Sequence, residues 1–324
     1  MAGPVPVVVA LGPVDPALVT GVLDGHCRFI PDPGDGDLHL AAGAIVRADA
    51  RVDLTLLDKA PALRVLARTG VGVDLVDVAA ATARGIAVVI TPGAGAAAVA
   101  EGAIGMALHL VKRFGPLTAL VREGRWAQRT AVCIGDLDGA TLGVVGYGRI
   151  GQRTAQLGAA FGMRILAYDP VSEPPADLRC TDLGDLAAHS DVITLHLPLT
   201  GQTRHLVDDA FLARVKPGAV LVNCSRGGLI DTDAVWRALI EGRLSGAGLD
   251  VFDPEPPAHH PLYSHPDVVL TPHLMGLSRR ATTATFTAAA RGILDVLAGR
   301  EPQAVANPAW RTHRTKEMHH DQLR

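Results

Sequence analysis

Short runs of β-branched residues alternate with alanine-rich helical stretches throughout this chain of 324 residues. This alternation is typical of repeated βα units, which build parallel sheets. Strands are expected at 5–11, 44–46, 65–68, 87–90, 141–145, 164–168, 192–195, 220–222, 246–250 and 268–270. Aromatic residues make up only 4% of the chain, so the core has to be built from small aliphatic side chains, which suits helices lying on a parallel sheet. The sequence therefore predicts an α/β fold.

The length of the chain favours two domains, because one domain usually takes roughly 100 to 200 residues. Residues 97–114 carry apolar side chains at helical spacing without an interior proline, so one long helix is expected there. That helix would lead from the first group of strands into the second. A last helix is expected over about 278–298, and the chain can return along it to the first domain.

Charge and cysteine content exclude several classes of protein. The 30 Lys and Arg residues nearly balance 33 Asp and Glu, for a formal charge of -3, which argues against nucleic acid or an anionic membrane as the main partner. Four cysteines form no CxxC pair and no metal-ligand spacing with histidine, so free thiols, a reducing compartment and no metal are expected. No apolar run approaches the ~18 residues that span a bilayer, and no signal peptide is evident. A cytoplasmic protein with a small-molecule substrate is predicted.

One segment, Gly146-Tyr-Gly-Arg-Ile-Gly151, matches the GxGxxG pattern of dinucleotide-binding turns. The bare pattern is weak evidence in a chain this rich in glycine, but its context is specific. The apolar run 141–145 leads directly into the first glycine, and a helical stretch over 150–161 follows. Gly146 allows a tight turn, Gly148 lets the backbone approach a pyrophosphate, and Gly151 lets helix and strand pack closely. The phosphates would lie at the amino end of the helix.

The acidic residue that such a turn requires is present at the end of the next expected strand. Asp169 follows 164–168, about 20 residues beyond the turn, where a carboxylate hydrogen-bonds the adenosine ribose. Taken alone, Asp169 would more often be a solvated acid after a strand. Together with the glycine turn it favours NAD over NADP, because a carboxylate repels a 2′-phosphate and no basic pair follows it.

Three later segments combine glycines with ionisable residues, and each follows an expected strand: 223–228, 248–257 and 271–276. Ligands of open parallel sheets bind at the carboxyl ends of the strands, so the polar side chains of these segments should converge. These side chains are Arg226, Asp250, Glu255 and His273. Any one of them could be an ordinary loop residue or a helix cap, but their shared placement predicts an active site.

With these residues the sequence resembles the D-isomer-specific 2-hydroxyacid dehydrogenase family, and within it the catalytic portion of D-3-phosphoglycerate dehydrogenases. The likeness extends from about residue 63 to 307. It is carried by Thr69-Gly-Val-Gly-Val-Asp74, Val99-Ala-Glu101, the glycine turn, His196-Leu-Pro198, and the Arg, Glu and His segments in the order of the family.

The resemblance implies roles for individual residues. Arg226 would bind the carboxylate and carbonyl oxygen of the substrate, His273 would be the general acid and base, and Glu255 would hold the imidazole. Asp250 would face the nicotinamide carboxamide. Further cofactor-binding positions are Thr91, Gly146, Gly148, Arg149, Ile150, Gly151, Asp169, Pro198, Cys224, Ser225 and Gly276.

Substrate binding is assigned in the same way to Arg68, Val71 and Gly72, together with Arg226, with backbone amides near Val71 and Gly72 holding the carboxylate. Arg68, and Arg129 from a partner subunit, could add positive charge for a second anionic group on the substrate. The alternative is that Arg68 pairs with a structural carboxylate and that Arg129 is solvated.

The resemblance also implies the architecture and the activity. We expect a Rossmann cofactor domain at 99–287, inserted into a discontinuous flavodoxin-like substrate domain of 1–98 and 288–324, with the active site in the cleft between them. The expected activity is NAD-dependent interconversion of a D-2-hydroxy acid and its 2-keto acid, such as 3-phosphoglycerate or glycerate with hydroxypyruvate, by a homodimer. The alternative is an NAD(H)-sensing binding protein of the co-repressor type.

Overall fold

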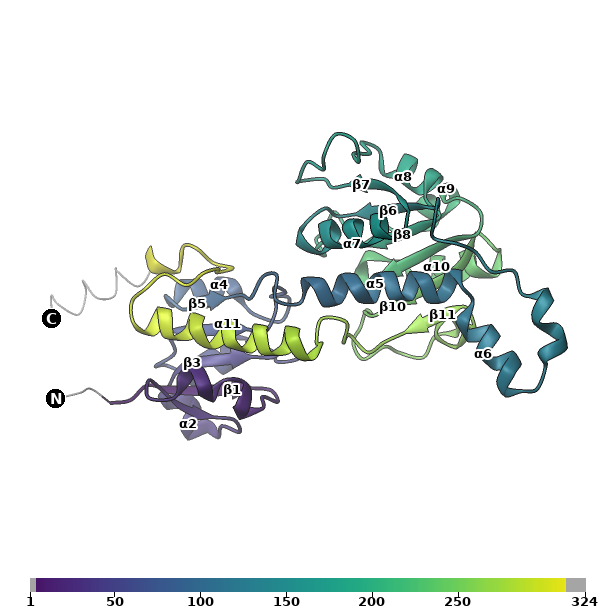
Figure 1. Ribbon diagram of the computed structural model, residues 1–324. Coiled ribbons are helices and arrows are strands. Elements are labelled where there is room, and N and C mark those ends of the chain that lie inside the picture. The colour runs from purple at the N-terminus through teal and green to yellow at the C-terminus, as the bar shows by residue number, and fades with distance from the viewer. Residues whose placement is uncertain (1–3, 313–324) are drawn as a thin grey trace. The chain divides into compact units, whose positions relative to one another are not determined.

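The computed structural model describes residues 4–312 and divides into two units (Figure 1). Unit 1 takes the residues up to Gly95 and those from Arg279 onward, and unit 2 is Ala96–Ser278. Residues 313–324, which the sequence prediction assigned to the first unit, lie outside the described part of the chain.

Both boundaries differ from the predicted residues 99 and 287, because each change of unit falls at the start of a continuous helix. Helix α5 (Ala96–Val111) belongs wholly to unit 2, and α11 (Arg279–Leu297) belongs wholly to unit 1. A boundary at 287 would divide α11, whose buried residues, among them Phe286 and Ile293, pack on one core.

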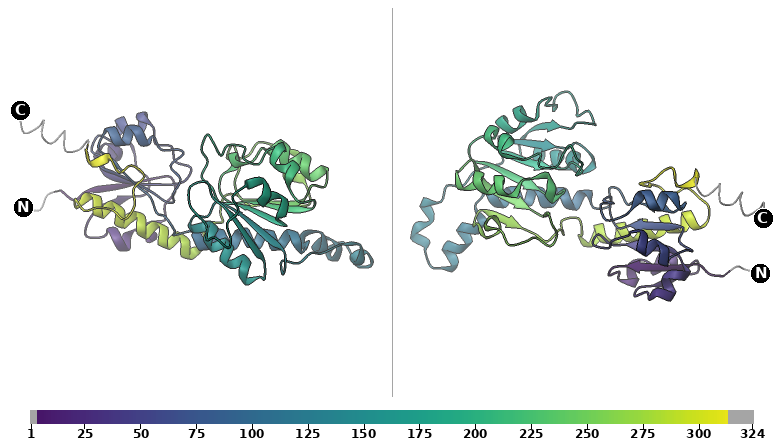
Figure 2. Two further views of the ribbon diagram at one scale, coloured as in Figure 1. Left: turned by 90° about the horizontal axis from the view of Figure 1, so that it is seen from above. Right: turned by 180° about the vertical axis from the view of Figure 1, so that it is seen from behind.

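Unit 1 is a five-stranded parallel sheet in the order β2-β1-β3-β4-β5. Its strands are β1 (Val7–Leu11), β2 (Arg28–Ile30), β3 (Ala41–Val46), β4 (Val65–Arg68) and β5 (Ala87–Val89). The short helices are α1 (Thr20–Leu23), α2 (Asp35–Leu40), α3 (Leu54–Lys59) and α4 (Val78–Ala83). Helix α11 lies along one face of this sheet (Figure 2). The strand order is that of flavodoxin-like folds, as predicted.

Unit 2 is a six-stranded parallel sheet in the order β11-β10-β9-β8-β6-β7. Its strands are β6 (Thr141–Val145), β7 (Arg164–Tyr168), β8 (Val192–Leu195), β9 (Ala219–Asn223), β10 (Leu244–Leu249) and β11 (Val268–Leu270). Strand β6 pairs with both β7 and β8, so the strand order reverses there. Ligands of doubly wound sheets bind at this switch point, and the predicted glycine turn follows β6.

Helices cover both faces of the second sheet, as an α/β fold requires. Helix α5 packs on one face together with α7 (Arg149–Ala160). Helices α8 (Leu183–His189), α9 (Asp209–Arg214) and α10 (Thr232–Ile240) pack on the other face. Helix α6 (Phe114–Arg122) and the 3-10 turn at Trp126–Ala131 extend beyond the sheet (Figure 1). The expectation of two parallel-sheet domains is thus confirmed.

No single helix within residues 4–312 is long and apolar enough to span a membrane. Helices α5 and α6 pass that test only when they are joined, and a bend of 57° separates them. Helix α5 contributes Val99, Ile104 and Leu110 to the core of unit 2, which accounts for its apolar composition.

Candidate active site

The glycine turn after β6 has the close contacts that its three glycines allow. Gly146 has φ +98°, and a Cβ added there would lie 2.6 Å from backbone carbon of His196. A Cβ at Gly151 would lie 1.9 Å from the carbonyl oxygen of Gly146. A Cβ at Gly148 would meet no atom within 4 Å, so the space beside this residue is open. The turn therefore leaves room for a ligand at the amino end of α7, where backbone N–H groups lack helical partners.

Asp169 joins the end of β7 to the glycine turn. One carboxylate oxygen accepts a hydrogen bond from the backbone N–H of Tyr147 at 2.7 Å, and the other accepts from Val171 and Ser172 at 2.8 Å each. Next to it is a cavity of about 390 Å³, lined by Tyr147, Gln152, Gln156, Ser172, Glu173 and Pro175. Asp169 thus lies at the position predicted from the sequence, whereas the residues that line the cavity were not predicted.

The Cβ contacts predict different outcomes for two substitutions in the turn. Gly148→Ala should leave thermal stability unchanged, since its φ of -72° suits alanine, but should weaken dinucleotide binding by about tenfold or more, equivalent to about 1.4 kcal/mol. Gly151→Ala should lower both stability and binding, because its Cβ overlaps the Gly146 carbonyl.

Thermal denaturation and NADH fluorescence titration separate these effects. Gly105→Ala on α5, where a Cβ also meets nothing within 4 Å, is the matched control and should bind like the wild type. Wild-type affinity in Gly148→Ala would contradict the placement of the phosphates.

His196 lies at the carboxyl end of β8, beside Gly146. Its Nε2 is 3.0 Å from the hydroxyl oxygen of Thr194, and its Nδ1 is buried without a hydrogen-bond partner among the described residues. Burial lowers the pKa of His196 to about 3, so the ring is neutral at physiological pH. The sequence marked His196 only as part of a motif, because its burial results from packing between segments.

Glu255 and His273 form a hydrogen-bonded pair on the loops that follow β10 and β11. Oε2 of Glu255 lies 2.8 Å from Nδ1 of His273, and Oε1 accepts a hydrogen bond from the backbone N–H of Phe252 at 3.0 Å. The side chain of Glu255 is 39% exposed and that of His273 is 42% exposed. With Nδ1 held by the carboxylate, Nε2 is left to exchange a proton with a bound molecule.

Asp250 follows β10 and is only 1% exposed. Its Oδ1 accepts hydrogen bonds from the Thr271 hydroxyl at 2.6 Å and the Leu274 N–H at 2.9 Å, and its Oδ2 accepts from the Met275 N–H at 3.1 Å. Burial raises the pKa of the neighbouring Cys224 thiol to about 12, and the charge of Asp250 adds to the effect. Cys224 therefore stays protonated and is no nucleophile.

Arg226 follows β9, on the same edge of the sheet as Glu255 and His273. Its Nη1 donates to the carbonyl of Ser225 at 2.8 Å, and its own carbonyl accepts from the Asn223 side chain at 2.8 Å. The next residue, Gly227, lies so close to the loop after β10 that a Cβ would be 2.0 Å from backbone of Phe252. The loops carrying Arg226 and Glu255 are therefore packed together, as their shared sheet edge predicts.

The other predicted cofactor residues in unit 2 lie on the same carboxyl edge. Arg149 and Ile150 begin α7, and Pro198 follows β8. Ser225 donates its hydroxyl to the carbonyl of Leu197 at 2.6 Å, which ties the loops after β8 and β9 together. Gly276 lies in the loop that carries His273, three residues before α11.

The predicted residues of unit 1 form a local loop after β4. Arg68 is 5% exposed; its Nε donates to the carbonyl of Gly72 at 2.7 Å, and its Nη1 donates to the carbonyl of Arg47. Val71 is 52% exposed, and Thr91 is buried beside the carbonyls of Arg68 and Gly70. Backbone carbonyls are thus among the partners of Arg68, and its bond to Gly72 ties it to the loop that follows β4. Arg129, in unit 2, stacks on the ring of Trp126 at 5.2 Å.

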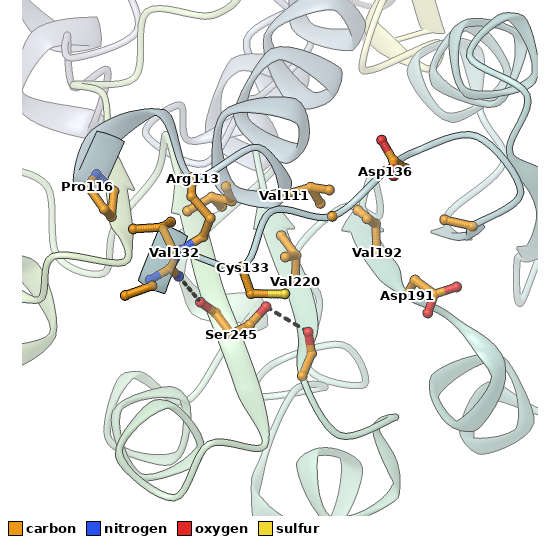
Figure 3. Close-up of a pocket in the computed structure, with 15 residues that line it drawn as sticks. Val111, Arg113, Pro116, Val132, Cys133, Asp136, Asp191, Val192, Val220 and Ser245 are labelled. Carbon is orange, nitrogen blue, oxygen red and sulfur yellow. Dashed lines mark hydrogen bonds between the residues drawn. The ribbon is translucent and has the colours of Figure 1, made fainter. Parts of the chain in front are cut away.

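A larger cavity, of about 560 Å³, lies elsewhere in unit 2, at the amino ends of β8, β9 and β10. Val192, Val220 and Ser245 line it together with Arg113 and Cys133 (Figure 3). None of the predicted site residues lines this cavity. It is at the opposite edge of the sheet from the carboxyl-end loops, so its size does not mark the active site.

Comparison with known proteins agrees with this geometry. Residues 104–275 match the family model described as D-isomer specific 2-hydroxyacid dehydrogenase, NAD binding domain. The chain is 41% identical over 268 residues to a D-3-phosphoglycerate dehydrogenase of Methanocaldococcus jannaschii, covering 81% of this chain and 51% of the relative. It therefore spans about half the length of this relative.

Other relatives are matched over more of their length. A hydroxypyruvate reductase of Thermotoga maritima is 41% identical over 235 residues, which is 71% of this chain and 76% of that protein. The solved structure of a D-lactate dehydrogenase from Aquifex aeolicus, complexed with NAD and lactic acid, is similar with a TM-score of 0.79 and 30% identity, covering 90% of this chain and 96% of that one.

Proposed function

The chain belongs to the D-isomer specific 2-hydroxyacid dehydrogenase family, and on that premise we propose that it interconverts a D-2-hydroxy acid and its 2-keto acid with NAD. The observation that carries the proposal is the 2.8 Å contact between Glu255 and Nδ1 of His273, on the sheet edge that also bears Arg226. A carboxylate-oriented imidazole can move a proton, and a guanidinium on the same sheet edge can stabilise a developing oxyanion.

Each of the three residues on this edge has a separate role in the proposed reaction. Bound NADH supplies the hydride in the reducing direction. Arg226 binds the substrate and stabilises the negative charge that develops on its carbonyl oxygen. His273 donates the proton from Nε2 to that oxygen, while Glu255 holds Nδ1 and orients the ring. In the oxidising direction the neutral imidazole takes the proton back.

The structure fits a dinucleotide at the glycine turn. Its backbone would hold the pyrophosphate beside Gly148, where a side chain is absent and the space is open. Asp169 would hold the adenosine ribose, and the cavity lined by Tyr147 and Glu173 would take the adenosine end.

The preference for NAD predicts a specific result for Asp169→Ala. This variant should narrow the gap in kcat/KM between NAD and NADP, because it removes both a ribose acceptor and a charge that repels a 2′-phosphate. The loss with NAD should be about tenfold or more, since a hydrogen bond to a charged group contributes roughly 1.5 to 3 kcal/mol.

Steady-state kinetics with both cofactors measure this gap. Asp169→Asn is the matched control, since it retains an oxygen acceptor for the Tyr147 N–H while removing the charge. A wild type that uses NADP more efficiently than NAD would overturn the assignment.

The direct test of the proposed function is an NADH-oxidation screen over 2-keto acids. Glyoxylate, hydroxypyruvate, pyruvate, phenylpyruvate, 2-ketoglutarate and 3-phosphohydroxypyruvate cover small, apolar and dianionic side groups. Turnover of any of these supports the proposal and identifies the substrate class. Binding of NADH without turnover of any of them would contradict it.

We further propose that the protein is a homodimer in a reducing, cytoplasmic compartment. The segment from α6 to β6 exposes several large apolar side chains, which a second copy would cover: Phe114, Val121, Trp126 and Ile134. All four cysteines are free, which supports the reducing compartment. No role for nucleic acid or membrane is proposed.

A further inference from the structure

The loop that carries His273 is held by the buried carboxylate of Asp250. The Thr271 hydroxyl donates to Asp250 from two residues before His273, and the N–H groups of Leu274 and Met275 donate from the two residues after it. One carboxylate thus binds the loop on each side of His273, since Oδ1 accepts from the Thr271 hydroxyl and the Leu274 N–H, and Oδ2 accepts from the Met275 N–H. Hydrogen bonds to an ionised, buried acceptor are stronger than those between neutral groups.

His273 itself has a backbone conformation that needs such support. Its φ is 55°, in the left-handed region that disfavours residues with a side chain. A conformation of this kind persists only where neighbouring groups hold it in place. The ring is fixed by Glu255 at Nδ1, but that contact alone does not fix the backbone from which the ring projects.

A packing contact secures the same loop from the side of α5. The side chain of Met275 lies over Gly102, where an added Cβ would be 2.3 Å from Sδ of Met275. Besides Glu255, the hydrogen bonds to Asp250 and the packing of Met275 on α5 therefore attach this loop to unit 2.

We propose that Asp250 is a positioning residue for the catalytic imidazole, acting through the backbone of residues 271–275, and this rests on the proposed function. Family resemblance would instead place Asp250 against the nicotinamide carboxamide. The two roles make different predictions, because the first affects the proton-transfer step and the second affects binding of the cofactor. A reacting group displaced by about 1 Å can lose about 100-fold in rate.

The two Thr271 variants test the donor and leave the charge of Asp250 intact. Thr271→Val removes the hydroxyl that donates to Asp250 at 2.6 Å, and Thr271→Ser keeps it. Asp250→Asn removes the charge and replaces one oxygen acceptor by an NH2 donor, which opposes the backbone N–H group that this oxygen binds. Asp191→Asn is the control, since Asp191 accepts a backbone N–H from Thr141 at 2.8 Å at the opposite edge of the sheet.

Two measurements on the full-length protein are compared for each variant: steady-state kinetics with NADH, and hydrogen exchange of the amides in residues 271–277. Asp250→Asn should lower kcat by about 10- to 100-fold, with the KM for NADH changed less than about threefold, and should speed exchange at Leu274 and Met275. Thr271→Val should also lower kcat and speed amide exchange in the loop, but to a smaller degree. Thr271→Ser and Asp191→Asn should behave like the wild type in both measurements.

Two results would overturn the proposal. One is a raised KM for NADH in Asp250→Asn with amide protection of the loop intact, which would assign Asp250 to the cofactor. The other is a loss of amide protection in the loop of Asp250→Asn while kcat stays at the wild-type value. If Asp250→Asn does not fold, the Thr271 pair decides. Failure of the proposed function can be distinguished from failure of the positioning role of Asp250. In the first case the wild type reduces no 2-keto acid, and hydrogen exchange still measures how strongly the loop is held.

Discussion

Replacing His273 by alanine is expected to lower kcat for reduction of the 2-keto acid by roughly 10²- to 10⁴-fold, the usual size of a general acid contribution. The imidazole is the group on this sheet edge whose Nε2 is left to give a proton once Glu255 holds Nδ1. Dissociation constants for NADH should change little, because the turn at Gly146–Gly151 is on a different loop. NADH oxidation and fluorescence titration measure the two quantities.

Glu255→Gln is the matched comparison for this variant. Glutamine can still contact the ring, but it no longer places a negative charge beside the imidazole during proton transfer. The kcat for reduction should therefore fall below that of the wild type. A kcat equal to that of the wild type would show that the 2.8 Å contact has no part in proton transfer.

Arg226→Gln is expected to reduce kcat/KM by about 100-fold or more, as removal of a donor to a developing oxyanion does in other enzymes. The guanidinium would bind both the carboxylate and the carbonyl oxygen, so the loss should appear in KM as well as kcat. Steady-state kinetics with the substrate found in the keto-acid screen measure both constants.

Arg226→Lys is the control for charge. Lysine keeps the positive charge but lacks the planar fork of five donors, so it should recover only part of the activity. Wild-type activity in Arg226→Lys would mean that the positive charge at this position is sufficient for catalysis. Unchanged kinetics in Arg226→Gln would remove Arg226 from the active site.

Several elements could be predicted because the information lies within a few neighbouring residues. The strands over 141–145 and 164–168, and the glycine turn between strand and helix, follow from local hydrophobic pattern and glycine spacing, and they match β6, β7 and the start of α7. Strand β2 (Arg28–Ile30) was not predicted, since it has three residues, begins with an exposed arginine and lies at an edge. Such a strand is specified by its neighbour β1 more than by its own sequence.

The sequence by itself determined the order of the βα units and the edge on which Arg226, Glu255 and His273 gather. Parallel strands share one carboxyl edge, so placing a residue after a strand places it in space. Only the tertiary structure decided which polar groups meet: Asp250 with the loop around His273, Arg68 with the carbonyls of Arg47 and Gly72, and the left-handed backbone of His273. Most of these contacts join residues about 20 positions apart, and no local pattern encodes a hydrogen bond between segments that only folding brings together.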